Sequence, residues 1–198
     1  MFWQQVHQLD QQVTLTINSW HSDFSDPIWQ FFSDKIAWIP MYMAIVALLI
    51  WKLGWKRGLL VVAAAGLTFG FCDQVSNIVK HTVERIRPLK DEWMIAHGLH
   101  VLEKGGGYSF FSAHAANAFS LACCTFAGML TSIKKKRKTP IWLKLYGGWI
   151  FFWALMVAVS RIFVGKHYLG DVIVGILVGS AAGITFGYLA GKLTHRLK

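Results

Sequence analysis

Acidic residues and cysteines are scarce in this chain. Of its 198 residues, 10 are Asp or Glu and three are Cys: Cys72, Cys123 and Cys124. Adjacent cysteines cannot form an unstrained disulfide, and there is no C-x-x-C spacing for a metal. We therefore expect all three to be small buried residues. The first thirty residues also lack the apolar core and cleavage site of a signal peptide, so membrane insertion is expected to rely on the mature spans.

What the chain has in abundance is apolar and basic residues. It is 55% hydrophobic with ten Trp, which is typical of an integral membrane protein. The net charge of +10 could indicate a protein that binds nucleic acid. No module of alternating aromatic and basic residues appears, and the apolar runs are long enough to span a bilayer. We expect a lipid bilayer as the surrounding medium and no nucleic-acid partner.

Five apolar runs predict an all-α fold, a polytopic membrane helix bundle. The runs cover residues 36–53, 58–79, 113–133, 141–159 and 168–191. The second run carries Asp73 at membrane depth, where we expect an interhelical hydrogen bond in preference to a functional role. The fifth has glycine at most fourth positions, which predicts a closely packed helix face. Residues 35–198 are expected to form one membrane domain.

The N-terminal segment, residues 1–34, is of a different character. Its apolar residues recur at roughly helical spacing and its glutamines fill the other face. This pattern indicates an amphipathic helix at the membrane interface, and it fits an ordinary packing helix or a short re-entrant helix equally well.

The distribution of basic residues predicts the orientation. Spans alternate sides, so the loops at 52–57 and 134–140 share one side with the tail after 191. Eleven of the twenty Lys and Arg lie there: Lys52, Lys56, Arg57, Lys134, Lys135, Lys136, Arg137, Lys138, Lys192, Arg196 and Lys198. The positive-inside bias assigns this side to the cytoplasm. Three polar segments that carry candidate catalytic and anion-binding residues then meet at the opposite, extracytoplasmic face.

The first two segments offer anion-binding groups and an imidazole. Lys80 and Arg87 can reach one anion if the helix ends between them, and Pro88 fixes the chain direction beyond. A basic membrane flank explains the same residues. Ser112 can cap a helix, and His114 could give a proton to a leaving oxygen.

The third segment is the richest. Arg161 is a fixed cation, and His167 is followed four residues later by Asp171, which can hold its ring if a helix begins near His167. Such an imidazole beside an arginine could attack a phosphate. A His-x-x-x-Asp pair could equally be a metal ligand set or a structural hydrogen bond. No H-E-x-x-H supports a metal, and nothing in the sequence arranges His81, His97 and His100 as ligands.

The order Lys-x6-Arg-Pro, Ser-x-His, Ser-Arg-x5-His-x3-Asp resembles the type-2 phosphatidic acid phosphatase superfamily of membrane lipid phosphatases. The resemblance covers roughly residues 36–191. The first and third motifs match fully, the third beginning at Ser160. In the second, Phe111 and Ala113 stand where the family usually has Pro and Gly. Ser112 and His114 are kept, so this departure bears on substrate and rate more than on reaction type.

The resemblance implies a metal-independent phosphatase without cofactor. His167 would attack the phosphorus and carry a transient phosphoryl group, Asp171 would orient His167, and His114 would protonate the leaving oxygen. The phosphate oxygens would be held by Lys80, Arg87, Ser112 and Arg161. Fixed donors of this kind supply most of the catalysis in phosphoryl transfer.

Among lipid substrates, undecaprenyl diphosphate is the first expectation, at the outer face of a bacterial cytoplasmic membrane. Lipid A, phosphatidylglycerol phosphate and phosphatidic acid are the alternatives within the same family. Two readings come from other classes: a haloperoxidase holding vanadate, and a non-catalytic protein that binds or transports lipid.

Overall fold

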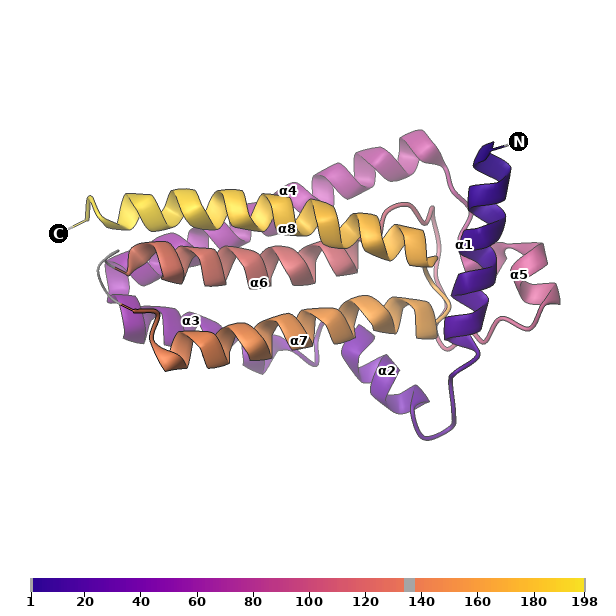
Figure 1. Ribbon diagram of the computed structural model, residues 1–198, viewed down its shortest axis with the longest axis horizontal. Coiled ribbons are helices and arrows are strands. Elements are labelled where there is room, and N and C mark those ends of the chain that lie inside the picture. The colour runs from indigo at the N-terminus through magenta and orange to yellow at the C-terminus, as the bar shows by residue number, and fades with distance from the viewer. Residues whose placement is uncertain (1, 134–137, 198) are drawn as a thin grey trace.

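The computed structural model describes residues 2–133 and 138–197, and over these residues it contains helices and no strand (Figure 1). The helices are α1 (Phe2–Asn18), α2 (Asp26–Ser33), α3 (Ile39–Leu53), α4 (Trp55–Val83), the 3₁₀ turn η1 (Pro88–Lys90), α5 (Glu92–Ala96), α6 (Ala113–Ser132), α7 (Ile141–Phe163) and α8 (Leu169–Thr194). The all-α prediction is confirmed. Most of the predicted basic loop at 134–138 lies outside the described residues.

The number of spans differs from the prediction. Within the described residues, four segments are long and apolar enough to cross a membrane: Trp55–Ala96, which contains α4, and the helices α6, α7 and α8. Helix α3 has 15 residues and is therefore about 22 Å long, short of the roughly 30 Å hydrocarbon core of a bilayer. Pro40 in its first turn and Gly54 just past its end set these limits. The predicted count of five spans is therefore not confirmed.

Helices α6 and α8 are packed along a seam of small residues. A Cβ atom added at Gly179 would lie 2.1 Å from the backbone oxygen of Ala116, and one at Gly187 would lie 2.3 Å from that of Cys124. Side chains at these positions would force the helices apart. The closely packed face predicted from the glycine spacing is confirmed, and all three cysteines are buried and free.

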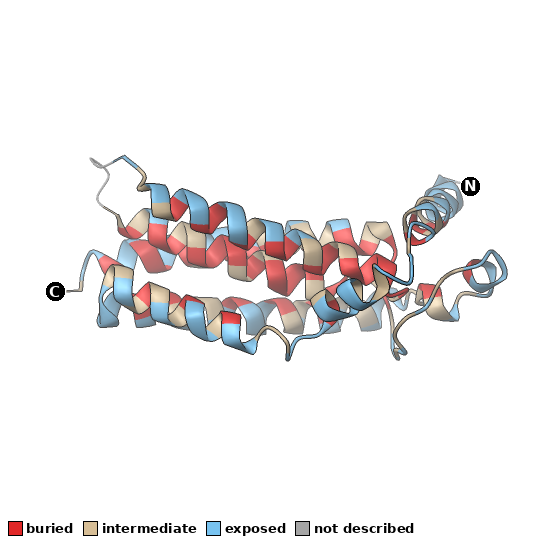
Figure 2. Cartoon of the chain, turned by 90° about the horizontal axis from the view of Figure 1, so that it is seen from below, coloured by how far each residue is buried: buried red, intermediate tan, exposed pale blue. Residues whose placement is uncertain are grey.

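The outer faces of the bundle are apolar. Figure 2 shows buried residues along the helix faces that point inward and exposed residues along the outer ones. Large exposed side chains on the long helices include Leu67, Phe152 and Leu177. Contiguous exposed apolar surface of this kind marks contact with lipid in a protein whose helices are long enough to span a bilayer.

Helix α1 lies across one end of the bundle, far from the C-terminus (Figure 1). Its polar face is the one that packs: Asp10 Oδ1 accepts from the backbone N–H of Gly170 at 2.9 Å, and Thr14 Oγ1 accepts from that of Leu169 at 2.9 Å. Amides in the first turn of a helix have no partner within it, so α1 caps α8. The apolar residues in the first half of α1, Trp3 among them, are exposed, whereas Ile17 near its end packs against the bundle. Its placement at a membrane interface stays a prediction.

Candidate active site

A polar pocket of ≈ 500 Å³ opens at the end of the bundle where α1 lies. Five of the seven residues predicted to form the site line it: Lys80, Arg87, His114, Arg161 and His167. They come from α4, the segment after it, the first turn of α6, the last turn of α7 and the loop before α8. The structure therefore brings the three sequence segments to one place.

The other two predicted residues stand behind the pocket wall. Ser112 is fully buried, and its Oγ accepts from the N–H of Ala115 at 3.4 Å as the N-cap of α6. Asp171 is also fully buried, in the first turn of α8. Neither lines the pocket, so Asp171 reaches it only through His167.

The end of α4 explains how Lys80 and Arg87 come to face one space. The helix ends at Val83, and Glu84 adopts a left-handed conformation with φ of 50°. The chain is then extended at Arg87, before Pro88 opens η1. The expectation that the helix ends between the two cations is confirmed.

The pocket is strongly cationic. Two lysines that the sequence motifs did not include, Lys35 and Lys166, also line it, so five cations surround a space whose lining includes one carboxylate, Asp73. That carboxylate accepts from Asn117 Nδ2 at 2.8 Å, the interhelical hydrogen bond expected for it. Lys166 is paired with Glu103 outside the pocket lining.

Two guanidinium groups in the pocket have unused donors. Arg87 Nε and Arg161 Nε are buried without a hydrogen-bond partner among the described residues. Buried donors are almost always satisfied in proteins, so such atoms indicate a missing acceptor. Arg161 is 2% exposed, and its Nη1 donates to Ser33 Oγ on α2. Guanidinium groups that line a pocket and have an unused donor suit the oxygens of a phosphate.

His167 sits in the tight turn between α7 and α8. The backbone N–H groups of Lys166 and His167 donate to the carbonyl of Arg161, and Gly165 takes a φ of +77° that L-residues avoid. Helix α8 begins at Leu169, so His167 lies outside it. The expected sharing of one helical face is therefore replaced by a turn that holds the ring over Asp171.

The contacts of the His167 ring fix its tautomer. Arg87 Nη1 lies 3.4 Å from His167 Nε2, and a guanidinium can only donate. The lone pair is therefore on Nε2 and the proton on Nδ1. Nδ1 is 3.4 Å from Asp171 Oδ2, near enough for attraction but outside hydrogen-bond geometry. Burial lowers the pKa of His167 to about 4; Asp171 opposes this, and Arg161 and Arg87 add to it.

The carboxylate behind His167 is held by groups that the sequence did not reveal. Asp171 Oδ2 accepts from Ser109 Oγ at 2.5 Å and from the N–H of Tyr168 at 3.1 Å. Asp171 Oδ1 accepts from Arg85 Nη1 at 2.7 Å, and Arg85 Nη2 donates to Asp10 Oδ2 at 2.7 Å. Arg85 lies two residues before a motif residue and has no spacing signal of its own.

An apolar pocket of ≈ 420 Å³ adjoins the polar one. Its walls come mainly from α3, α4, α6 and α7, with Tyr42, Phe69 and Trp153 among them. It shares Lys35 and His114 with the polar pocket. A charged site and an apolar cavity thus meet at the same two side chains.

Residues 55–194 match the PAP2 superfamily. The chain belongs to the PAP2 superfamily. As a PAP2 protein with several candidate spans it is a membrane lipid phosphatase, as its three motifs predicted.

Two curated relatives extend the match beyond the family region. The chain is 36% identical over 98% of its length to a lipid A 4'-phosphatase of Bacteroides thetaiotaomicron, of which it covers 82%. It is 30% identical over 90% of its length to a lipid A 4'-phosphatase of Porphyromonas gingivalis, of which it covers 71%.

Solved structures agree with the PAP2 fold. A PAP2-type phosphatidylglycerolphosphate phosphatase from Bacillus subtilis superposes with a TM-score of 0.66 at 19% identity, covering 98% of this chain and 88% of that one. Aquifex aeolicus LpxE superposes with a TM-score of 0.57 at 21% identity, covering 88% and 92%. At these identities the likeness concerns the fold alone.

Proposed function

We propose that this PAP2 protein removes a phosphate from lipid A through a phosphohistidine at His167. The observation that carries the proposal is the buried imidazole whose Nε2 lone pair lies at the pocket, between unused arginine donors and the Asp171 carboxylate. A nucleophile oriented by a carboxylate and facing preorganised cations is the arrangement that phosphoryl transfer needs.

The proposed reaction has two steps. His167 Nε2 forms a bond to phosphorus while the bond from phosphorus to the lipid oxygen breaks, and His114 gives that oxygen a proton. Water then attacks the phosphohistidine, His114 takes a proton from the water, and the bond between phosphorus and Nε2 breaks to release phosphate. The proton on Nδ1 stays with the ring and is drawn toward Asp171, whose contact tightens as positive charge develops on His167.

The cations have two tasks in this scheme. Lys80, Arg87 and Arg161 hold the non-bridging oxygens and supply the positive charge that stabilises the transition state, so the chemistry needs no metal. His114 lines the same pocket as these cations, so it can reach the oxygen of a lipid whose phosphate they hold.

The assignment to lipid A rests on the names of the two relatives and on the paired pockets. Undecaprenyl diphosphate, the first expectation from sequence, has no specific support. The apolar pocket beside the cations suits an acyl chain attached to the bound phosphate. The described basic residues Lys52, Lys56 and Arg57 lie at the α3–α4 junction, at the opposite end of α4 from Lys80. This supports a pocket on the outer face of a bacterial cytoplasmic membrane.

The test is phosphate release by the purified chain in detergent from four lipids: bis-phosphorylated lipid A, undecaprenyl diphosphate, phosphatidylglycerol phosphate and phosphatidic acid. We expect release from lipid A, a loss of at least about 10³-fold in His167→Ala, and no loss in His97→Ala, whose ring lies outside the pocket. Vanadate should inhibit by occupying the phosphate position.

Two outcomes contradict the proposal. Activity of folded His167→Ala within a few-fold of the parent chain would remove the nucleophile assignment. Absence of release from all four lipids would favour the alternative of a protein that binds or transports lipid without turnover.

A further inference from the structure

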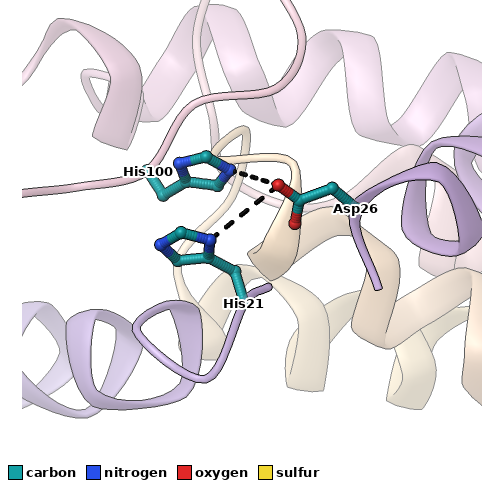
Figure 3. A group of neighbouring side chains, drawn as sticks. All are labelled: His21, Asp26 and His100. Carbon is teal, nitrogen blue, oxygen red and sulfur yellow. Dashed lines mark hydrogen bonds and ion pairs between the residues drawn. The ribbon is translucent and has the colours of Figure 1, made fainter. Parts of the chain in front are cut away.

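Three metal-ligating side chains meet outside both pockets, at the junction of the N-terminal helices with the loop after α5 (Figure 3). They are His21 in the turn after α1, Asp26 at the start of α2, and His100. One ligand atom from each lies within 4.8 Å of the others. Asp26 Oδ2 is 2.8 Å from His100 Nε2 and 3.8 Å from His21 Nδ1.

The cluster contains polar atoms with nothing to bind. His21 Nδ1 and Asp26 Oδ1 are buried and have no hydrogen-bond partner among the described residues. Leaving such atoms unsatisfied costs free energy, and a native structure usually explains each one by a water, an ion or a function. A single cation would satisfy the nitrogen and the carboxylate together.

We propose that His21, Asp26 and His100 bind a divalent transition-metal ion, of which Zn²⁺ is the best fit. Two imidazole nitrogens and one carboxylate oxygen are typical Zn²⁺ ligands. At metal–ligand distances of about 2.0–2.1 Å, tetrahedral ligand atoms are about 3.3 Å apart, between the two separations seen here. The side chains of His21 and His100 are 33% and 30% exposed, so water can reach the fourth position.

Ion binding requires one ring to turn. The imidazoles of His21 and His100 are stacked, with centroids 3.6 Å apart and planes 3° from parallel. A metal ion lies close to the plane of each ring that binds it, so two stacked rings cannot share one ion. His21 is the ring that moves, because its Nδ1 has no hydrogen bond to lose. His100 keeps its place, but its proton moves from Nε2, which donates to Asp26 Oδ2 in the structure, to Nδ1, so that Nε2 can offer its lone pair to the ion.

The position of the cluster indicates what the ion does. Asn18 Nδ2 already donates to the carbonyl of His100 at 3.0 Å, and the N–H of His100 donates to Asn18 Oδ1 at 2.8 Å. The loop continues from His100 to Glu103, the partner of Lys166, and to the pocket wall at Gly105. The ion therefore joins α1 and α2 to the loop that lines the phosphate pocket, without contacting the phosphate.

The experiment uses the full chain in detergent, free of histidine tags, stripped with chelator and titrated with Zn²⁺ by calorimetry. We expect one Zn²⁺ per chain and a higher melting temperature when it is bound. Co²⁺ should give visible absorption bands from the same site. In His21→Gln and Asp26→Asn, Zn²⁺ binding should be at least tenfold weaker and the Co²⁺ bands should disappear. Asp26→Asn keeps an oxygen acceptor for His100, so its fold should persist.

The matched control is His97→Gln, an exposed imidazole of the same loop that contacts Trp93 and not the cluster. It should bind Zn²⁺ as the parent chain does. Equal binding by His21→Gln, Asp26→Asn and the parent chain would place the ion elsewhere and overturn the proposal. Absence of stoichiometric binding by the parent chain would overturn it as well, leaving the three residues as a hydrogen-bonded cluster.

Chelator effects distinguish this ion from a catalytic one. In the proposed site, chelator lowers the melting temperature of the parent chain and leaves that of His21→Gln unchanged, while phosphate release at a temperature well below unfolding persists in both. Loss of phosphate release in His21→Gln on chelation, restored by a divalent metal, would show a second metal in the reaction itself and contradict the metal-free mechanism.

Discussion

Arginine side chains lie on both sides of His167, and the two sides differ in whether these arginines form ion pairs with carboxylates. On the pocket side, Arg87 and Arg161 make no ion pair with a carboxylate among the described residues, and each has a buried Nε without a partner. On the far side, Arg85 is paired with both Asp171 and Asp10 at 2.7 Å, and its guanidinium lies 3.9 Å from the centroid of the Tyr168 ring.

Arg87 and Arg161 are thus available to bind an anionic ligand, whereas Arg85 stabilises the fold. A buried charge without a partner destabilises the fold, whereas Arg85 pairs with the buried carboxylate of Asp171 and the partly buried carboxylate of Asp10, so its removal would leave a buried charge unpaired. We therefore expect pocket-side substitutions to lower activity without lowering stability, and substitutions behind His167 to lower both. The predictions below test this division.

Among the substitutions that test this division, Arg161→Met on the pocket side has the largest expected effect. Phosphate release should fall about 10²- to 10³-fold because a preorganised phosphate donor is lost. The melting temperature should stay the same or rise, because a buried unpaired cation has been removed. Arg161→Lys keeps the charge but lacks the planar guanidinium group, so its rate of phosphate release should lie between those of the parent chain and Arg161→Met. A marked loss of stability in Arg161→Met would break the comparison.

Arg85→Met tests the far side. It leaves Asp171 and Asp10 without their cation, so the free energy of unfolding should fall by about 3 kcal/mol, and activity should fall with it. Chemical denaturation in detergent measures the first and phosphate release the second. The control is Arg57→Met. Arg57 is exposed and donates to the carbonyl of Leu197, so its replacement should change the free energy of unfolding by less than about 0.5 kcal/mol. Equal stability of the two variants would contradict a structural role for Arg85.

The pH profile tests the imidazole between the two sides. In the proposed reaction neutral His167 is the attacking form, so the acid limb of kcat/KM should lie near its lowered pKa of about 4, below the ordinary 6.5. Arg87→Met removes a charge that lowers this pKa and should move the limb upward. Asp171→Asn removes the group that raises it and should move the limb downward, at a much lower rate.

Stability should follow the same titration. The folded pKa of His167 is below the unfolded value, so its neutral form contributes fully above about pH 6.5, and this contribution is lost as the pH falls toward 4. Melting temperatures of the parent chain and of His167→Gln across this range measure the difference. An acid limb that remains near 6.5 in every variant would show that another group limits the rate.

The smallest predicted effect is that of Asp10→Asn, three contacts away from the His167 ring. Its amide oxygen can still accept one hydrogen bond, so stability should fall by only about 1 kcal/mol. Because Arg85 becomes less firmly placed, kcat should fall a few-fold while KM stays unchanged. Asp23→Asn, an exposed residue of the turn after α1, should alter neither. A change in KM alone would mean that Asp10 acts on lipid binding.

The sequence predicted the pocket side of the site well, because its residues are placed by local features. A helix end and Pro88 direct Arg87 toward Lys80, a cap at Ser112 starts α6, and a glycine turn presents His167. Each of these features can be recognised from a few neighbouring residues of the sequence. The glycine spacing likewise predicted the closely packed face of α8, though not that α6 is the helix packed against it.

The far side could not be predicted, because its contacts join distant parts of the chain. Asp10 reaches Arg85 and Gly170 only because α1 packs across the end of the bundle, and although Asp10 is the one carboxylate of α1, nothing local in the helix indicates what it contacts. Similarly, His21 and His100 are too far apart in sequence to form a ligand motif. The length of α3 was overestimated because three apolar residues, 36–38, precede the start of the helix.

The glycine seam has a consequence for how the bundle is assembled. Its contacts repeat every four residues on both helices, with Gly175, Gly179, Gly183 and Gly187 facing Ser112, Ala116, Ser120 and Cys124. A slip of α8 along α6 by one helical turn would preserve most of that packing. Polar contacts favour the correct register. The backbone carbonyl of Asp171 accepts a hydrogen bond from the N–H of Ser112 at 3.0 Å, and its carboxylate accepts one from the hydroxyl of Ser109. Asp171, which we propose orients His167, thus also helps to align the two helices, as does Thr194 at the other end of α8, whose hydroxyl donates to Ser132 Oγ at 3.1 Å.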